Sequence, residues 1–428
     1  MGDSNTPKLS VIEGGGVASP AGVRAGGIHA GFRKNPQRLD MALIEVDEPA
    51  VAAGAFTTNK FCAAPVQVSR AHLGPSGSAP VRAVCINSGN ANAATGDEGL
   101  DCAEETCDIV AKTVGCAPEQ VLVASTGVIG QLLDVAPFTS GVPALHEKLA
   151  VAAADEAARQ AGGHDAAHAI MTTDTHPKER AVSYEAAGAL AGHTVTVGGM
   201  CKGSGMIMPN MATMIAIVTT DAPVTPEALH EVLIGVVKAT FNKVTVDSDT
   251  STNDTCIAIA TGAAAPGVAP IEPGTPEAAE LAAAVNGVCQ HLAREIAADG
   301  EGASKLVTVT VAGAPTEADA DTAARAIANS PLVKTAIYGH DCNWGRIAMA
   351  LGKCGVEFDQ RDVDIDIMGM PVCRKGLTVA FDEDEALRRF EEPEITIWAD
   401  LGAGTCETTV WTCDLTHEYV KINGEYRT

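Results

Sequence analysis

No charged residue lies between Lys202 and Asp221, and this stretch begins Lys202-Gly-Ser-Gly-Met-Ile-Met-Pro-Asn-Met-Ala-Thr-Met-Ile-Ala216. Its length alone would fit a membrane helix, but its glycines, proline, asparagine and threonines would carry chain breaks and polar groups into hydrocarbon. The run is therefore expected to lie buried within protein. Thr213 precedes a candidate strand at 214–219 and would present a hydroxyl at the edge of an apolar core. Residue types alone favour an ordinary buried turn there, since threonines commonly enter strands.

The composition around this run restricts the class of protein. At about 150 residues per domain, 428 residues correspond to two or three domains. Hydrophobic residues make up 46% and aromatic residues only 4%, so the core is expected to consist mainly of Ala, Val, Ile and Leu. The 29 Lys and Arg against 54 Asp and Glu give a net charge of −25, which repels phosphate backbones and anionic lipid headgroups. Neither nucleic acid nor a membrane is an expected partner.

The cysteines and the first residues bear on location. Thirteen cysteines are an odd number, no CxxC pair occurs, and they are scattered through apolar segments, which is typical of reduced thiols in a cytosolic protein. The first eight residues hold no apolar stretch of the kind a secretion signal needs. We therefore expect a cytoplasmic protein.

Short β-rich runs alternate irregularly with helical stretches. The Thr-Pro-Glu triplets at Thr225 and Thr275 each place a hydroxyl at N-cap and Pro at N1, so each predicts a helix start, and the second helix is expected to end at 299–300. Further helices are expected at 101–114, 142–160 and 317–328, and linkers at 71–80 and 263–276. Strands are expected at 82–86, 121–124, 194–197, 214–219, 255–260, 306–311, 363–368, 377–381 and 395–399. Several strands follow one another directly, which favours a layered α+β fold, and a composition shift at 312–315 suggests a smaller C-terminal α/β unit from about 312 to 428.

Two apparent metal motifs fail on inspection. The run Asp247-Ser-Asp-Thr-Ser-Thr-Asn-Asp254 has the alternate oxygens of a calcium loop, but Thr252 replaces the glycine of its sixth position and Ala258 the glutamate of its twelfth. His164 and His168 have the spacing of two zinc ligands on a helix, without a catalytic glutamate or an evident third ligand. No metal site is predicted.

A set of motifs in a fixed order carries a family resemblance. Lys202–Met206 and Pro209–Met214 resemble the cleavage segment of the ornithine acetyltransferases of arginine biosynthesis, bifunctional enzymes that also act as N-acetylglutamate synthases. The likeness covers most of the chain and recurs in Asn87-Ser-Gly-Asn-Ala-Asn92, Ser125-Thr-Gly-Val-Ile-Gly130, Thr172-Thr-Asp-Thr175, the stretch 247–255, Asp299-Gly-Glu-Gly-Ala303, Asn343-Trp-Gly-Arg346 and Tyr419-Val-Lys-Ile-Asn-Gly-Glu-Tyr-Arg-Thr428.

The resemblance implies a precursor that cuts its own bond between Ala212 and Thr213, giving an α chain of residues 1–212 and a β chain of residues 213–428. Its fold would be an α-β-β-α sandwich similar to N-terminal nucleophile hydrolases but differently connected, and its assembly an α2β2 heterotetramer. A threonine hydroxyl is a poor nucleophile, but the new α-amino group, with an unperturbed pKa of about 8, can take its proton. Thr213 would then be both nucleophile and base.

The same match implies roles for other residues. Thr126 and Gly127 resemble the oxyanion hole, whose donors stabilise the charge that develops on the carbonyl oxygen. The residues that resemble the substrate-binding set are Thr172, Lys202, Thr213, Glu301, Asn423 and Thr428. The implied reaction takes acetyl from N-acetylornithine to glutamate without a dissociable cofactor, and a bifunctional member would also accept acetyl-CoA.

Two other readings stay open from the sequence. An amidohydrolase or aminopeptidase on the related self-cleaving scaffold would let water resolve the acyl-enzyme, but the terminal block 423–428 belongs to the acetyltransferases. A cleaved but catalytically silent binding protein is the other alternative, and the intact Thr126, Gly127 and Thr213 argue against it.

Overall fold

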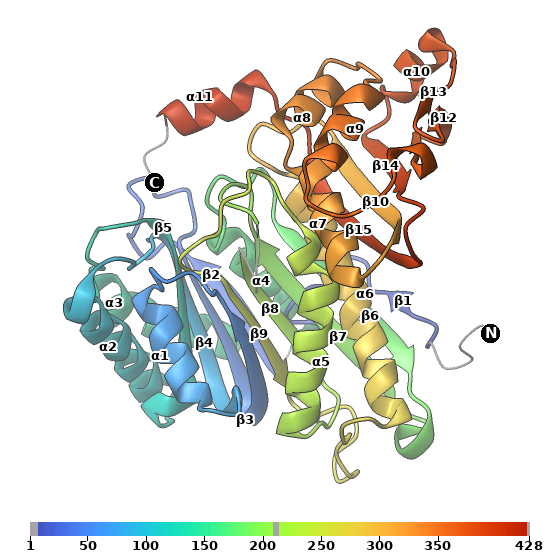
Figure 1. Cartoon of the computed structure of the whole chain (residues 1–428). Helices are drawn as coiled ribbons and strands as arrows, with labels where there is room; N and C mark the ends of the chain where they lie inside the picture. The colour runs from blue at the N-terminus through green and yellow to red at the C-terminus, as the bar shows by residue number, and fades with distance from the viewer. Residues whose placement is uncertain (1–6, 154, 209–213, 426–428) are drawn as a thin grey trace.

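The computed structural model describes residues 7–153, 155–208 and 214–425 (Figure 1). Two β-sheets organise this part of the chain, one of nine strands and one of six. Helices flank both sheets, which confirms the predicted α+β class.

The nine-stranded sheet has the order β1-β6-β7-β8-β9-β3-β4-β5, with β2 added on β3. Strands β8 and β9, which follow Thr213 in the sequence, lie between β7 and β3, which precede it. The strands are β1 Ser10–Val11, β2 Val23–Ile28, β3 Met41–Phe56, β4 Ser78–Asn90, β5 Val121–Val128, β6 Lys178–Glu185, β7 Thr194–Lys202, β8 Ile215–Thr220 and β9 Thr255–Ala260. The α-helices that accompany them are α1 Ala64–Leu73, α2 Gly96–Val114, α3 Ala136–Ala152, α4 Glu156–Ala169, α5 Pro226–Ala239 and α6 Pro276–Ala298.

The long strand β3 joins two layers of this sheet. Its first half pairs with β2 and its second half with β9, and its register against β4 shifts between Glu45 and Ala50. A buried apolar cluster lies between the layers and includes Ile215 and Ile257 of one layer with Ile44 of the other. The outer faces are covered by α5 and α6 on one side and by α1, α2 and α3 on the other. The predicted α-β-β-α layering is thus built by one continuous sheet.

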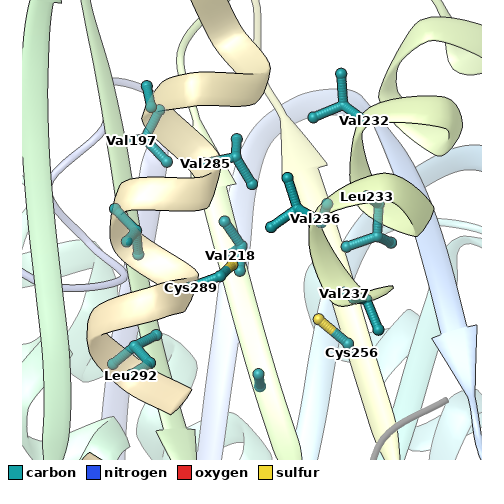
Figure 2. Packing of buried hydrophobic residues seen from close by; sticks show 14 of the residues in the cluster. Val197, Val218, Val232, Leu233, Val236, Val237, Cys256, Val285, Cys289 and Leu292 are labelled. Carbon is teal, nitrogen blue, oxygen red and sulfur yellow. The ribbon is translucent and has the colours of Figure 1, made fainter. Parts of the chain in front are cut away.

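Helices α5 and α6 lie side by side over β7, β8 and β9, and their apolar side chains meet those of the strands (Figure 2). Both helices begin where the sequence predicts. The hydroxyls of Thr225 and Thr275 accept hydrogen bonds from the amides of Ala228 and Ala278 at 3.3 and 3.2 Å. Helix α6 ends at Ala298, as predicted, and this fixed end sets the position of the next loop.

The six-stranded sheet has the order β13-β12-β11-β14-β10-β15. Only β10 and β14 run parallel, and the other neighbours are antiparallel. Its first strand begins at Leu306, ahead of the composition shift at 312. Its strands are β10 Leu306–Ala314, β11 Asp364–Ile367, β12 Met370–Arg374, β13 Leu377–Thr378, β14 Glu394–Asp400 and β15 Cys406–Cys413. The helices of this half are α7 Glu317–Ala328, α8 Pro331–Tyr338, α9 Trp344–Gly352, α10 Glu383–Arg389 and α11 His417–Glu425.

Two sequence expectations are wrong. The single helix at 142–160 is two helices, α3 and α4, and the side chain of Asp155 caps the second by accepting from the amide of Ala157. The linker at 71–80 is mostly regular structure, because α1 continues to Leu73 and β4 begins at Ser78. Glycine and proline in 74–77 mark only the tight turn between them.

All thirteen cysteines carry free thiols, and seven of them are buried. In the described ranges, no helix combines the length and the apolar character needed to cross a membrane.

Candidate active site

One pocket collects side chains from both halves of the chain. It lies where the ends of β5 and β7 meet the loop before β6, the loop between α5 and β9, the loop after α6, and helix α11. Its lining residues are Ala91, Thr126, Gly127, Ile129, Thr172, Thr173, Lys202, Gly205, Met206, Asp247, Asp249, Ser251, Thr252, Asn253, Glu301, Tyr419 and Asn423.

The pocket brings together the described members of the predicted site. These are Thr126, Gly127, Thr172, Lys202, Glu301 and Asn423. Ala212, Thr213 and Thr428 lie outside the described residues.

Lys202 ends β7 at the wall of the pocket. It pairs with Ile215, the first residue of β8, and is only 8% exposed. Within the described residues, no acceptor lies within hydrogen-bonding distance of its ammonium group. Burial lowers the pKa of Lys202, although nearby carboxylates, Asp174 first, oppose this shift. A buried cation without a partner can bind the carboxylate of a ligand at little further desolvation cost.

A buried charge cluster lies beneath Lys202. The ammonium of Lys178 is 2.8 Å from Asp174 and 2.5 Å from Asp299. Asp174 also accepts from the amides of Gly203 and Thr172, at 2.7 and 2.9 Å, and so fixes the backbone beside two pocket residues. Burial opposes the charge of Asp174, but the ammonium groups of Lys178 and Lys202 hold its pKa well below the usual range. This cluster could not be recognised from the sequence, because Asp299 lies 121 residues beyond Lys178 and meets it only in the folded chain.

Glu301 and Asn423 form a pair in the lining of the pocket. The amide nitrogen of Asn423 donates to a carboxylate oxygen of Glu301 at 2.7 Å. Gly205 makes room for that carboxylate, since a Cβ at position 205 would lie 2.3 Å from the carboxyl carbon of Glu301. The pair presents one anionic group and one amide to the pocket.

Thr126 and Gly127 lie at the end of β5, where its register with β4 becomes irregular. Gly127 has φ of +137°, and a Cβ there would lie 2.3 Å from the carbonyl carbon of Gly89. Only glycine fits this conformation and this approach. Both residues line the pocket, so the end of β5 forms part of its wall.

The loop 247–254 contributes residues that the sequence analysis did not assign to the site. Asn253 donates to the carbonyls of Ala91 and Ser125, at 2.6 and 2.8 Å, and so ties this loop to β5. Asp247 and Asp249 line the pocket. Within the parts of the chain that are described, no group of three or more His, Cys, Asp or Glu residues could hold a metal ion. The density of polar residues in 247–254 was the sequence signal for this loop, and the loop forms part of the pocket wall.

Helix α11 contributes two side chains to the pocket lining. It places Tyr419 and Asn423 one helical turn apart, on the same face. Gly302 permits the contact, since a Cβ there would lie 2.6 Å from the amide nitrogen of Tyr419. Burial, reinforced by the charge of Asp247, raises the pKa of the Tyr419 phenol, so this hydroxyl stays protonated.

The family model for the ArgJ family matches residues 24–428, nearly the whole chain. The chain belongs to the ArgJ family. The arginine biosynthesis bifunctional protein ArgJ of Symbiobacterium thermophilum is 48% identical over 415 residues, covering 97% of this chain and 99% of the relative. The ArgJ protein of Thermosynechococcus vestitus is 44% identical, covering 97% and 98%.

The crystal structure of an ArgJ protein from Bacillus halodurans is 41% identical with a TM-score of 0.47, covering 49% of this chain and 98% of that chain. Membership of the ArgJ family confirms the resemblance inferred from the sequence motifs, and with it the prediction of an enzyme of arginine biosynthesis.

Proposed function

We propose that this chain transfers an acetyl group from N-acetylornithine to glutamate through an acetyl ester of Thr213. The observation that carries the proposal is the convergence of the predicted set in one pocket, within a chain that matches ArgJ proteins over nearly its whole length. The converging residues are Thr126, Gly127, Thr172, Lys202, Glu301 and Asn423.

The nucleophile is generated by self-cleavage between Ala212 and Thr213. The products are an α chain of residues 1–212 and a β chain of residues 213–428, which assemble as an α2β2 heterotetramer in the cytoplasm. The new α-amino group of Thr213 accepts the proton of the Thr213 hydroxyl as the hydroxyl oxygen attacks the acetyl carbonyl carbon. No dissociable cofactor takes part in this cycle.

The reaction then proceeds in two half-reactions. Thr126 and Gly127 donate to the carbonyl oxygen as it becomes negative, and the intermediate collapses by breaking the bond to the ornithine nitrogen, which leaves with a proton. The amine of glutamate attacks the acetyl ester in turn and releases Thr213. Lys202 binds a substrate carboxylate, because its ammonium is buried and has no partner among the described residues. Thr172, Glu301, Asn423 and the terminal Thr428 complete the substrate contacts.

Acetyl-CoA is a second acetyl donor in this proposal. The relatives carry the name bifunctional protein, and a second donor that acetylates the same Thr213 would give one site two overall reactions. Acetyl transfer from acetyl-CoA to glutamate yields N-acetylglutamate and free CoA.

The test is an acetyl-transfer assay with glutamate as acceptor and either N-acetylornithine or acetyl-CoA as donor. N-acetylglutamate should form from both donors, and Thr213→Ala should abolish both reactions and leave one full-length band of 43.7 kDa on a denaturing gel. Free acetate without N-acetylglutamate would instead identify a hydrolase. A wild-type protein that stays full-length and is active would exclude the free amine as the base.

A further inference from the structure

Asp247 binds the backbone just before the proposed cleavage segment. One of its carboxylate oxygens accepts from the amide of Met206 at 2.6 Å, and the other accepts from the amide of Ile207 at 2.8 Å. Both oxygens of one side chain are therefore engaged by consecutive residues. This segment continues in the sequence toward Ala212 and Thr213.

The residues around Asp247 hold the same segment at two further points. The amide of Val246 donates to the carbonyl of Ile207 at 2.6 Å, and the hydroxyl of Thr250 donates to the carbonyl of Met208 at 2.9 Å. Ile207 also forms an isolated antiparallel bridge with Thr250. The loop thus fixes three consecutive residues through their backbone.

The conformation held in this way is strained. Met206 has φ of +58°, a left-handed value that residues other than glycine rarely adopt. Such a conformation costs about 1 to 3 kcal/mol and persists only where surrounding contacts impose it. The bond from the Met206 amide to Asp247 is one of these contacts.

We propose that Asp247 is a positioning residue for the self-cleavage step, and this inference rests on the proposed function above. Its carboxylate fixes the backbone of Met206 and Ile207, which precede the scissile bond in the sequence. The hydrogen bonds that Val246 and Thr250 donate to the carbonyls of Ile207 and Met208 assist it. In this role Asp247 does not contact the reacting atoms.

The step that Asp247 supports is an acyl shift followed by hydrolysis. The hydroxyl oxygen of Thr213 attacks the carbonyl carbon of Ala212, the bond to the Thr213 nitrogen breaks, and the hydroxyl proton passes to that nitrogen. Water then hydrolyses the ester, giving the carboxylate of Ala212 and the free hydroxyl of Thr213. Attack needs the oxygen and the carbonyl carbon near 3 Å apart, and an error of about 1 Å can cost about 100-fold in rate.

The test measures cleavage of newly made protein in a cell-free translation system, followed as loss of the 43.7 kDa band. Asp247→Asn should slow cleavage about 10- to 100-fold, because the two backbone amides bind different carboxylate oxygens and asparagine replaces one of these oxygens by an NH2 donor. Asp247→Glu should restore part of the rate, since it keeps two acceptor oxygens. Thr250→Val, which removes one bond, should slow cleavage by less.

Asp221→Asn is the matched control. Each oxygen of Asp221 likewise accepts from a backbone amide, those of Thr196 and Ala21, but Asp221 is buried where Asp247 is half-buried, and it follows the other end of β8. This variant should cleave at the wild-type rate even if it lowers the melting temperature.

The outcomes separate the two proposals. Wild-type protein that does not cleave would overturn the proposed function and this inference with it. Wild-type protein that cleaves, alongside Asp247→Asn at the same rate, would overturn only the role of Asp247. If Asp247→Asn fails to fold, a wild-type cleavage rate in Thr250→Val would also count against the role of this loop. Equal slowing in Asp221→Asn and Asp247→Asn would show a general effect of stability instead of positioning.

Discussion

Lys178 and Lys202 are both buried and lie on paired strands at the same end of the sheet, yet their surroundings are opposite. Lys178 contacts two carboxylates, and their charges raise its pKa against the effect of burial. Lys202 has no ion-pair partner among the described residues, and burial lowers its pKa. The charge of Lys178 is therefore neutralised within the fold, whereas that of Lys202 has no such partner among the described residues, as its proposed role in binding a substrate requires. Burial alone does not distinguish a structural lysine from a binding one.

The largest effect expected from this contrast is on stability. Lys178→Met should lower the free energy of unfolding by about 3 to 5 kcal/mol, because it leaves Asp174 and Asp299 buried without their cation. The measurement is urea denaturation of the uncut Thr213→Ala precursor with and without the substitution. Lys421→Met removes an exposed ion pair with Glu418 and serves as the control, with an expected loss below about 1 kcal/mol. An equal loss of unfolding free energy in Lys178→Met and Lys421→Met would show that the buried ion pairs of Lys178 stabilise the fold no more than an exposed one.

Lys202→Met should instead affect catalysis. On its proposed role as the partner of a substrate carboxylate, the loss of this cation should lower kcat/KM for N-acetylornithine by about 100- to 1000-fold, since a desolvated charge contact is worth several kcal/mol. Stability should be unchanged or higher, because an uncompensated buried charge is removed. Steady-state kinetics and thermal unfolding of the same preparation provide the two readings. An unchanged kcat/KM together with a lower melting temperature would show that Lys202 stabilises the fold and does not bind substrate.

The pH dependence should separate the lysines further. KM should rise as pH increases through the lowered pKa of Lys202, because the neutral amine no longer binds a carboxylate. Lys202→Arg, which stays charged, should remove that rise at the cost of a higher KM throughout. KM measured across the alkaline range for both proteins tests this. A rise of the same size in the arginine variant would assign the titration to another group.

The two lysines should also give opposite slopes of stability against pH. Between the lowered pKa of Lys202 and its ordinary value of 10.5, the unfolded chain binds more protons, so this group makes stability rise with pH. The pKa of Lys178 is raised, so its contribution is complete below 10.5 and is lost as pH rises through the raised value. Denaturation of Lys178→Met and Lys202→Met against pH should show the two slopes separately. Parallel curves would contradict the opposite shifts.

The smallest effect is expected from Glu301→Gln. The carboxylate of Glu301 is one of the charges that favour protonated Lys202. Its removal should lower the pKa of Lys202 further and move the alkaline rise in KM to lower pH by less than about 1 unit, equivalent to under about 1.4 kcal/mol. The same KM profile measures it. A shift to higher pH would contradict the assigned interaction.

The sequence predicted regular elements best where the local signals agree. The Thr-Pro-Glu starts of α5 and α6 combine a cap, a proline and an apolar period, and both are correct. Strand β3 was missed, because Glu45, Asp47, Glu48 and Pro49 interrupt its apolar pattern and only its pairing with three other strands identifies it. The break between α3 and α4 was missed, because helix-favouring alanines occur on both sides of it and no glycine or proline marks it.

In the pocket, too, residues marked by local sequence signals were predicted and those brought together by distant contacts were not. Motifs carried by short blocks, such as Thr126-Gly127 and Lys202, were found by family resemblance. The buried charge cluster beside them was not found, because Asp299, at the end of α6, reaches Lys178 and its neighbour Asp174 only in the folded chain. The tight contact of Gly205 with Glu301 is likewise visible only in three dimensions.

The strand order of the nine-stranded sheet has a consequence for any cut before Thr213. Strands β8 and β9 would belong to the second fragment, with β7 and β3 of the first fragment hydrogen-bonded on either side of them. Separating the fragments would open two ladders and expose the cores on both faces, so a nicked molecule should behave as one cooperative unit. Made as separate chains, the first fragment would have a gap two strands wide, with unpaired edges prone to aggregation. If the chain is cut there, the linear precursor would act as its own assembly guide, and the peptide bond after residue 212 would become dispensable only once the interleaved strands had paired in register.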